Sequence, residues 1–168
     1  QQTLDSIQVA VLKNPSLEVT KAYNTALKKV DSVQTIYAKI TEGKYIAPFV
    51  KASSRNNPRK LFTSVNAYLD NITNTYFDRL DFSNQTLVNS SFLTNRILDY
   101  IFYINYAEDE IEQNELHKTS ITTILSKIKD TSYKRDIIEF LIEQFEESKN
   151  LKIIDYLFEN HYNKLPNS

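Results

Sequence analysis

Apolar residues recur every three or four positions over most of this 168-residue chain, which is the period of an amphipathic helix. The longest such stretch begins after Ser16, a typical N-cap residue, and ends at Gly43, the single glycine. Similar spacing predicts helices within residues 45–52, 61–76, 95–106, 116–128, 137–145 and 151–162. The run from Tyr100 to Tyr106 is strongly apolar, so we expect the most buried helix there. The pattern predicts an all-α fold, an irregular bundle of about six to seven amphipathic helices with mostly antiparallel neighbours.

The same pattern indicates how the chain is organised. Residues 1–15 have a mixed pattern, a short strand or a fraying helix, and are interpreted as a tail or the end of a preceding domain. Residues 16–165 form the predicted helical accessory domain, in two sub-parts, 16–80 and 81–165, that share one core. Residues 166–168 begin with Pro166, which stops a helix, and are interpreted as a linker.

One stretch interrupts the helical period and is rich in aromatic and acidic residues. We call it the pivot, and it comprises Tyr76, Phe77, Asp78, Asp81, Phe82 and Ser83. Asp and Ser side chains compete with a helix for backbone hydrogen bonds, so the helical pattern is expected to break here. Asp78 and Asp81 are the best-placed carboxylates for acid–base chemistry, because adjacent aromatic rings raise a carboxyl pKa by desolvation. The favoured interpretation is capping, in which Asp81 and Ser83 satisfy free backbone donors at a helix boundary.

Composition excludes several kinds of site. The chain has no cysteine, so it carries no disulfide, thiol nucleophile or cysteine-ligated zinc. A single glycine argues against glycine-rich phosphate loops. The net charge of −1 gives no global attraction to nucleic acid, and no apolar run approaches the roughly 18 residues of a membrane span. Methionine is absent even from position 1, so we interpret the chain as a processed product or an excised piece of a longer one.

The two histidines are the obvious candidates for metal binding or proton transfer. Neither has a partner one helical turn away that would complete a ligand pair. A metal site at Glu115 and His117 is weighed against a surface histidine, and the surface histidine is favoured. His161 falls at the end of the last helix, where a cation suits the helix dipole. We therefore predict no catalytic residue, no cofactor and no metal site.

Charge is distributed unevenly along the chain. Residues 1–80 hold 11 Lys and Arg against 6 Asp and Glu, whereas residues 81–168 hold 9 against 15. Solvated helix faces explain this asymmetry, and the functional alternative is a dipolar surface that orients a neighbouring domain or subunit. The small basic cluster of Arg55, Arg59 and Lys60 is too small for specific nucleic-acid binding.

The pivot sequence Tyr76–Ser83 and the downstream Leu87, Phe92 and Ile97 resemble a pattern in Bacteroidetes thiol–disulfide oxidoreductases, in the helical region that precedes their thioredoxin domain. Residues 154–162 resemble the helix that in this family is soon followed by the thioredoxin-like fold. The chain departs from the family in having no Cys-x-x-Cys active site. The resemblance implies a non-catalytic helical region of a protein exported to the periplasm or cell envelope, with lipoprotein anchoring in the full-length form. It carries over no catalytic residue.

Three functions are consistent with these observations. The leading hypothesis is an accessory domain that orients a downstream thioredoxin-like domain, forms a homodimer or recognises client proteins. The second is a free-standing helical scaffold or peptide-binding module. The third is an unrecognised enzyme that uses Asp78, Asp81 or His161, and it requires those side chains to converge in one pocket.

Overall fold

The computed structural model describes residues 2–13 and 16–166, which form helices and their connections. No β-strand occurs among these residues, and the prediction of an all-α bundle is confirmed. The chain divides into two compact units, Gln1–Leu80 and Asp81–Ser168, which we call unit 1 and unit 2. Their boundary falls inside the pivot. Residues 1, 14–15 and 167–168, which include parts of the predicted tail and linker, lie outside the described residues.

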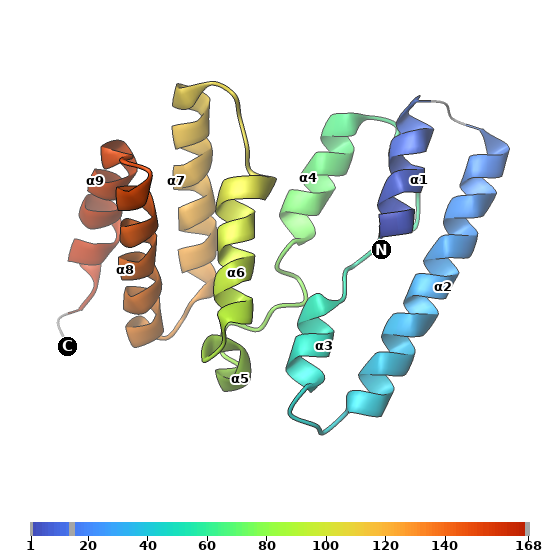
Figure 1. Cartoon of the computed structure of the whole chain (residues 1–168), viewed down its shortest axis with the longest axis horizontal. Coiled ribbons are helices and arrows are strands. Elements are labelled where there is room, and N and C mark those ends of the chain that lie inside the picture. The colour runs from blue at the N-terminus through green and yellow to red at the C-terminus, as the bar shows by residue number, and fades with distance from the viewer. Residues whose placement is uncertain (1, 14–15, 167–168) are drawn as a thin grey trace. The chain divides into compact units, whose positions relative to one another are not determined.

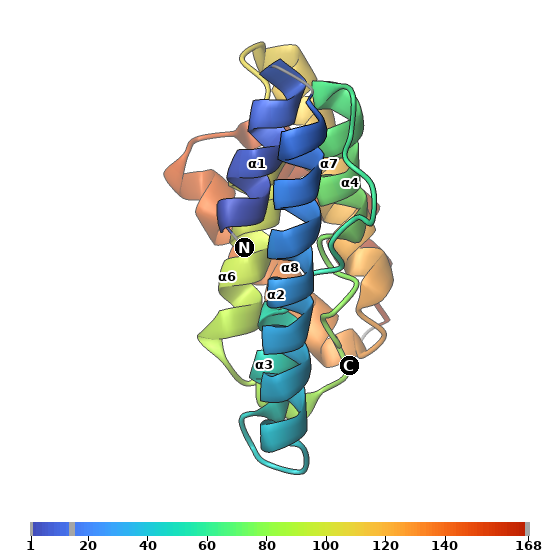
Figure 2. The ribbon, with the colours of Figure 1, turned by 90° about the vertical axis from the view of Figure 1, so that its right-hand side faces the viewer.

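Unit 1 contains four helices, α1 (Gln2–Lys13), α2 (Leu17–Thr41), α3 (Ala47–Ser53) and α4 (Val65–Thr75). Helices α1 and α2 run antiparallel, and α2 is the longest element of the unit (Figures 1 and 2). The Ser16 hydroxyl accepts the backbone N–H of Val19 at 3.2 Å, which fixes the start of α2 as the sequence predicts. After α2, Gly43 adopts a φ of 71°, a left-handed conformation that glycine reaches without strain.

The core of unit 1 lies at the N-terminal half of α2. Leu4 of α1 is buried there with Tyr23 and Leu27 of α2. The Gln8 side chain adds a two-way bridge, donating to the carbonyl of Phe62 at 3.0 Å and accepting its N–H at 2.9 Å. Helix α1 is therefore joined to distant parts of unit 1 by apolar packing and by buried polar contacts.

A charged cluster links the same helix to the rest of the unit. Asp5 of α1 accepts a hydrogen bond from the Tyr68 hydroxyl at 2.9 Å and pairs with Arg55 at 3.1 Å. Burial, followed by the hydrogen bond to Asp5, raises the pKa of Tyr68 to about 12. Tyr68 thus stays protonated and donates to Asp5 throughout the neutral range.

Two segments that the sequence analysis does not count among its six to seven helices are helical, and for the first of them it leaves a short strand or a fraying helix open. Residues 2–13, set apart there as a tail, form α1 and contribute to the core of unit 1. Residues 85–88, within the stretch expected to be irregular, form the single turn α5 (Gln85–Val88). These two segments account for the difference between the predicted six to seven helices and the nine α-helices found among the described residues.

Unit 2 continues from α5 with α6 (Ser91–Asp99), the π-helical turn η1 (Tyr100–Ile104), α7 (Glu110–Lys127), α8 (Thr131–Glu147), α9 (Leu151–Asn160) and the 3₁₀ turn η2 (Tyr162–Lys164). Helices α6 to α9 alternate in direction (Figure 1). Asp109, Asp130 and Asn150 cap the last three α-helices through their side chains.

The core of unit 2 is extensive and almost entirely aliphatic. Its most deeply buried side chains are Leu87, Leu93, Ile97, Ile101, Ile121, Ile124, Ile128, Ile138, Leu141, Phe145, Ile153 and Leu157. They come from every α-helix of the unit, which explains how short helices are held in place.

The prediction that Tyr100 to Tyr106 forms the most buried helix is wrong. The segment opens into the π-helical turn η1, in which Tyr100 and Ile101 are buried. Tyr103 and Tyr106 are 76% and 69% exposed. An uninterrupted apolar run cannot be one face of an amphipathic helix, so only part of it is buried: Phe102 packs against Phe145 at 5.2 Å between ring centroids, whereas the two exposed tyrosines lie on the surface.

Candidate functional site

The pivot ends one helix and begins a connection. Helix α4 stops at Thr75, and Tyr76 stacks edge-on against Phe77 at 5.0 Å between ring centroids. Phe77 and Phe82 are buried. The aromatic part of the pivot therefore serves packing.

The two pivot carboxylates are engaged in local hydrogen bonds. Asp78 accepts from the Asn56 side chain at 2.9 Å. Asp81 accepts from the backbone N–H of Ser83 at 2.9 Å and from its hydroxyl at 2.6 Å. Both carboxylates are exposed to solvent. These contacts are those of turn-stabilising side chains, as the capping interpretation expects for Asp81.

His117 is a core residue, and the prediction of a surface histidine is wrong. It is only 7% exposed, and its ring lies edge-on to Phe102 and Phe145 at 5.5 and 5.0 Å between centroids. Burial lowers its pKa from the usual 6.5. The neighbouring Glu115 pairs with Lys118 at 2.7 Å instead. Among the described residues, no group of three or more His, Cys, Asp or Glu side chains is placed to hold a metal ion.

His161 caps the C-terminus of α9 and lies edge-on to the Tyr156 ring at 5.3 Å. Burial lowers its pKa, and the positive charges of Lys164 and Lys134 lower it further. The cationic form expected at this helix end is therefore disfavoured. His161 belongs to unit 2 and Asp78 to unit 1.

One group of exposed apolar side chains in unit 1 lies on α2. Four side chains on one face of this helix are between 45% and 55% exposed. We call them the α2 apolar stripe, and they are Val33, Ile36, Tyr37 and Ile40. Their spacing of three, one and three residues places them together over two turns. Tyr45 and Ile46, which follow in the chain, are exposed as well.

Helix lengths explain why this face of α2 is only partly covered by the described residues. Helix α2 has 25 residues and so extends roughly 37 Å, whereas α1 has 12 and extends roughly 18 Å. The core that α1 completes involves Tyr23 and Leu27, near the start of α2. The stripe lies beyond that core. Hydrophobic periodicity identifies these positions as the apolar face of a helix, but it does not reveal which part of that face is covered.

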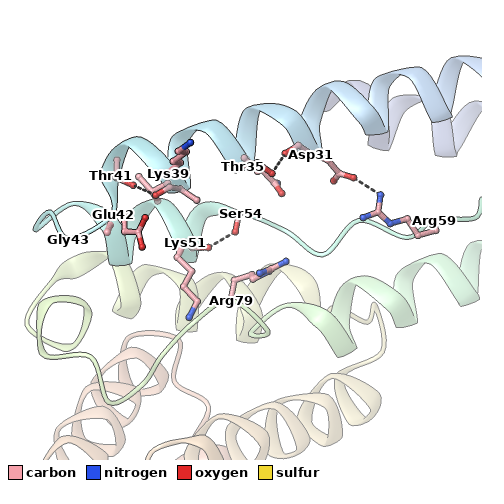
Figure 3. Close-up of a pocket in the computed structure, with 14 residues that line it drawn as sticks. Asp31, Thr35, Lys39, Thr41, Glu42, Gly43, Lys51, Ser54, Arg59 and Arg79 are labelled. Atoms are coloured by element: carbon pink, nitrogen blue, oxygen red, sulfur yellow. Dashed lines mark hydrogen bonds and ion pairs between the residues drawn. The ribbon is translucent and has the colours of Figure 1, made fainter.

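A second feature of unit 1 is a cavity of about 690 Å³ beside the C-terminal half of α2, bounded by α2, α3 and Arg79 (Figure 3). We call it the α2–α3 groove. Its lining comprises Asp31, Gln34, Thr35, Ala38, Lys39, Thr41, Glu42, Gly43, Ala47, Val50, Lys51, Ser54, Arg59 and Arg79. The sequence analysis names Arg59 and Gly43 for other reasons, but it does not link the four cations of this set, because they come from separate segments that only the fold brings together.

Comparison with known proteins identifies no relative. No family model, no curated protein and no solved structure matches this chain. None of the described helices combines the length and the apolar character needed to cross a membrane. Assignment of function therefore depends on the two surface features of unit 1.

Proposed function

We propose that this chain is a non-catalytic, protein-binding helical module, and that unit 1 binds an amphipathic helix of a partner protein through the α2 apolar stripe. The observation that carries the proposal is the exposure of Val33, Ile36, Tyr37 and Ile40 on one helix face. Side chains at this spacing are the anchors by which one helix packs along another.

The energy available at the stripe is sufficient for recognition. Each of its side chains is about half exposed, and complete burial of such a residue contributes roughly 1 kcal/mol. Four of them supply roughly 4 kcal/mol before the costs of association are subtracted. The stripe therefore supports a moderate-affinity contact that polar rim residues must strengthen.

Charge beside the stripe favours an acidic partner helix. Lys29 lies one turn before Val33 on the same side of α2, and Lys39 lies one turn after Ile36. Both lysines are exposed and form no ion pair within the described residues. Unit 1 as a whole carries 11 basic against 6 acidic residues. A second copy of the chain would bring its own lysines to the same edge, so a homodimer through this face is disfavoured.

The kind of full-length protein to which this chain belongs is a second part of the proposal. The pivot resemblance supports an accessory domain of an exported thioredoxin-like thiol–disulfide oxidoreductase, in which case the partner is the redox domain or its client. The coding sequence beyond Ser168 tests this setting. A Cys-x-x-Cys motif soon after Ser168 is expected, and a natural stop codon at that point would contradict the setting while leaving the binding role intact.

Binding is tested on the full chain by titration followed by NMR. The probe is a soluble amphipathic helical peptide with leucines on one face and glutamates at its edges, and the matched probe carries lysines at those edges. We expect the glutamate peptide to perturb residues 33–40, and to bind at least tenfold more weakly to the double variant Ile36→Ser, Ile40→Ser. The control is Val65→Ser, Leu69→Ser, which removes two equally exposed apolar side chains from α4 and should bind normally.

Three outcomes would contradict the proposal. The first is absence of shifts in residues 33–40 at millimolar peptide. The second is saturable binding of anionic phospholipid vesicles through the stripe in place of the peptide, which would identify a membrane-surface face. The third is concentration-dependent dimerisation that Ile36→Ser abolishes, which would identify a second copy as the occupant.

A further inference from the structure

We infer that the α2–α3 groove is a second binding site, which takes a short acidic peptide segment in an extended conformation. The groove is lined entirely by residues of unit 1. None of the four stripe residues lines it, although Lys39 borders both surfaces, and this site does not depend on the proposed function.

Uncompensated positive charge is the first observation. The groove is lined by four cations and two carboxylates. Arg59 and Asp31 neutralise each other by pairing. Lys39, Lys51 and Arg79 have no ion pair or side-chain hydrogen bond among the described residues, and Glu42 is the one remaining acid. Figure 3 shows Lys51 and Arg79 reaching from α3 and from the segment after α4 along the same side of the groove.

The length of the groove selects an extended chain. Its lining runs along α2 from Asp31 to Glu42, which is roughly 16 Å at the rise of an α-helix. An extended peptide advances roughly 3.3 Å per residue, so the groove accommodates about five residues. Ala38, Ala47 and Val50 provide small apolar positions against which a peptide backbone can lie closely.

The hydroxyl groups of the groove distinguish a peptide from a simple anion. Thr35 donates its hydrogen to the Asp31 carbonyl at 2.8 Å, and Ser54 donates to the Lys51 carbonyl at 2.6 Å. Because both hydroxyl hydrogens are already donated, the two oxygens can only accept hydrogen bonds from a ligand. A peptide offers N–H donors for them and carboxylates for the cations, whereas inorganic phosphate at neutral pH offers mainly acceptors.

The charges that line the groove predict where the acidic residues of the bound segment lie. Arg79 presents a guanidinium, which binds a carboxylate through two parallel hydrogen bonds. Acidic side chains of the peptide are therefore expected beside Lys51 and Arg79. Glu42 also lines the groove and repels an acidic group placed beside it, so a neutral or basic residue of the segment is expected there.

The test uses the full chain and fluorescence polarisation at low salt. The probes are a labelled five-residue peptide with two adjacent glutamates and a C-terminal lysine, its glutamine analogue, and inorganic phosphate as competitor. We expect the glutamate peptide to bind at least tenfold more tightly than the glutamine analogue. The double variant Lys51→Gln, Arg79→Gln should bind the glutamate peptide at least tenfold more weakly. The matched control, Lys21→Gln, Lys28→Gln, removes the same charge from α2 outside the groove and should retain binding within twofold.

A charge reversal keeps the result interpretable if the glutamine variant is weakened for structural reasons. Arg79→Glu should reverse the preference, binding a lysine-containing peptide better than the glutamate peptide, with an unchanged circular dichroism spectrum. Ile36→Ser, outside the groove, should leave glutamate-peptide binding unchanged even if the stripe proposal fails. The inference is overturned if the control variant loses as much affinity as the groove variant, or if phosphate displaces the peptide at equal concentration.

Discussion

At the scale of single residues, His117 shows how burial changes what a side chain does. Its ring lies against Phe102 and Phe145, and its Nδ1 atom is buried without a hydrogen-bond partner among the described residues. Protonation would place a charge in that aromatic environment, which is why burial lowers the pKa. The histidine that the sequence offers as a metal ligand is instead an acid-sensitive part of the core.

The pH dependence of stability follows from this pKa. Between the lowered pKa of folded His117 and 6.5, the unfolded chain binds more protons than the folded one. Stability therefore falls as the pH decreases below about 6.5, with a slope of at most about 1.4 kcal/mol per pH unit for one proton. We expect His117→Phe to reduce this slope in urea unfolding measured between pH 7.5 and 5.

His161→Gln serves as the comparison for that experiment. The pKa of His161 is also lowered, so removing this histidine should also reduce the slope of stability against pH. A chain whose stability is as pH-dependent after both substitutions as before would show that other groups, such as the carboxylates, dominate this range.

At the scale of elements, the end of α2 is set by one backbone conformation. Gly43 has a positive φ of 71°, and a Cβ atom added there meets no other atom within 4 Å. Gly43→Ala is therefore expected to destabilise unit 1 by about 1 kcal/mol through backbone strain alone, without a steric clash. The neighbouring Lys44→Ala provides the control, and urea unfolding followed at the unit 1 tyrosines provides the measurement. Equal stability of the two variants would contradict this account.

Elements whose boundaries depend on local chemistry were predictable from the sequence. Ser16 and Gly43 mark the limits of α2 through an N-cap and a left-handed residue, and both are visible as residue types. For helix α1 the sequence leaves a short strand and a fraying helix open, because its helicity depends on packing of Leu4 against Tyr23 and Leu27. Tertiary contacts of this kind override weak local periodicity.

The candidate sites were less predictable than the helices. Periodicity indicates that Ile36 and Ile40 lie on an apolar face, but only the lengths of α1 and α2 decide that this part of the face is uncovered. The groove joins Lys39, Lys51 and Arg79 from three segments, and no local pattern links them. The pivot, which the sequence marks most clearly, serves packing and turn formation.

At the scale of the whole molecule, the two units differ in how much apolar surface they bury. The twelve most deeply buried large side chains among the described residues all belong to unit 2. Unit 1 has a smaller core around Leu4, Tyr23 and Leu27, and it depends in addition on the polar bridges of Gln8 and Asp5. Stability is thus concentrated in one unit, while the candidate binding surfaces are concentrated in the other.

This asymmetry predicts how the units behave when separated. A fragment of residues 81–168 should fold alone, with a helical circular dichroism spectrum and a single cooperative thermal transition, because it contains all twelve of these deeply buried side chains. A fragment of residues 1–80 should be helical but unfold at a clearly lower temperature, since a small core leaves little net stability. Ligands that bind unit 1 at the stripe or the groove should then raise the midpoint temperature of unfolding of the 1–80 fragment. They should leave the midpoint temperature of the 81–168 fragment unchanged. The opposite order of stabilities, or a molten 81–168 fragment, would show that burial within each unit does not govern its stability.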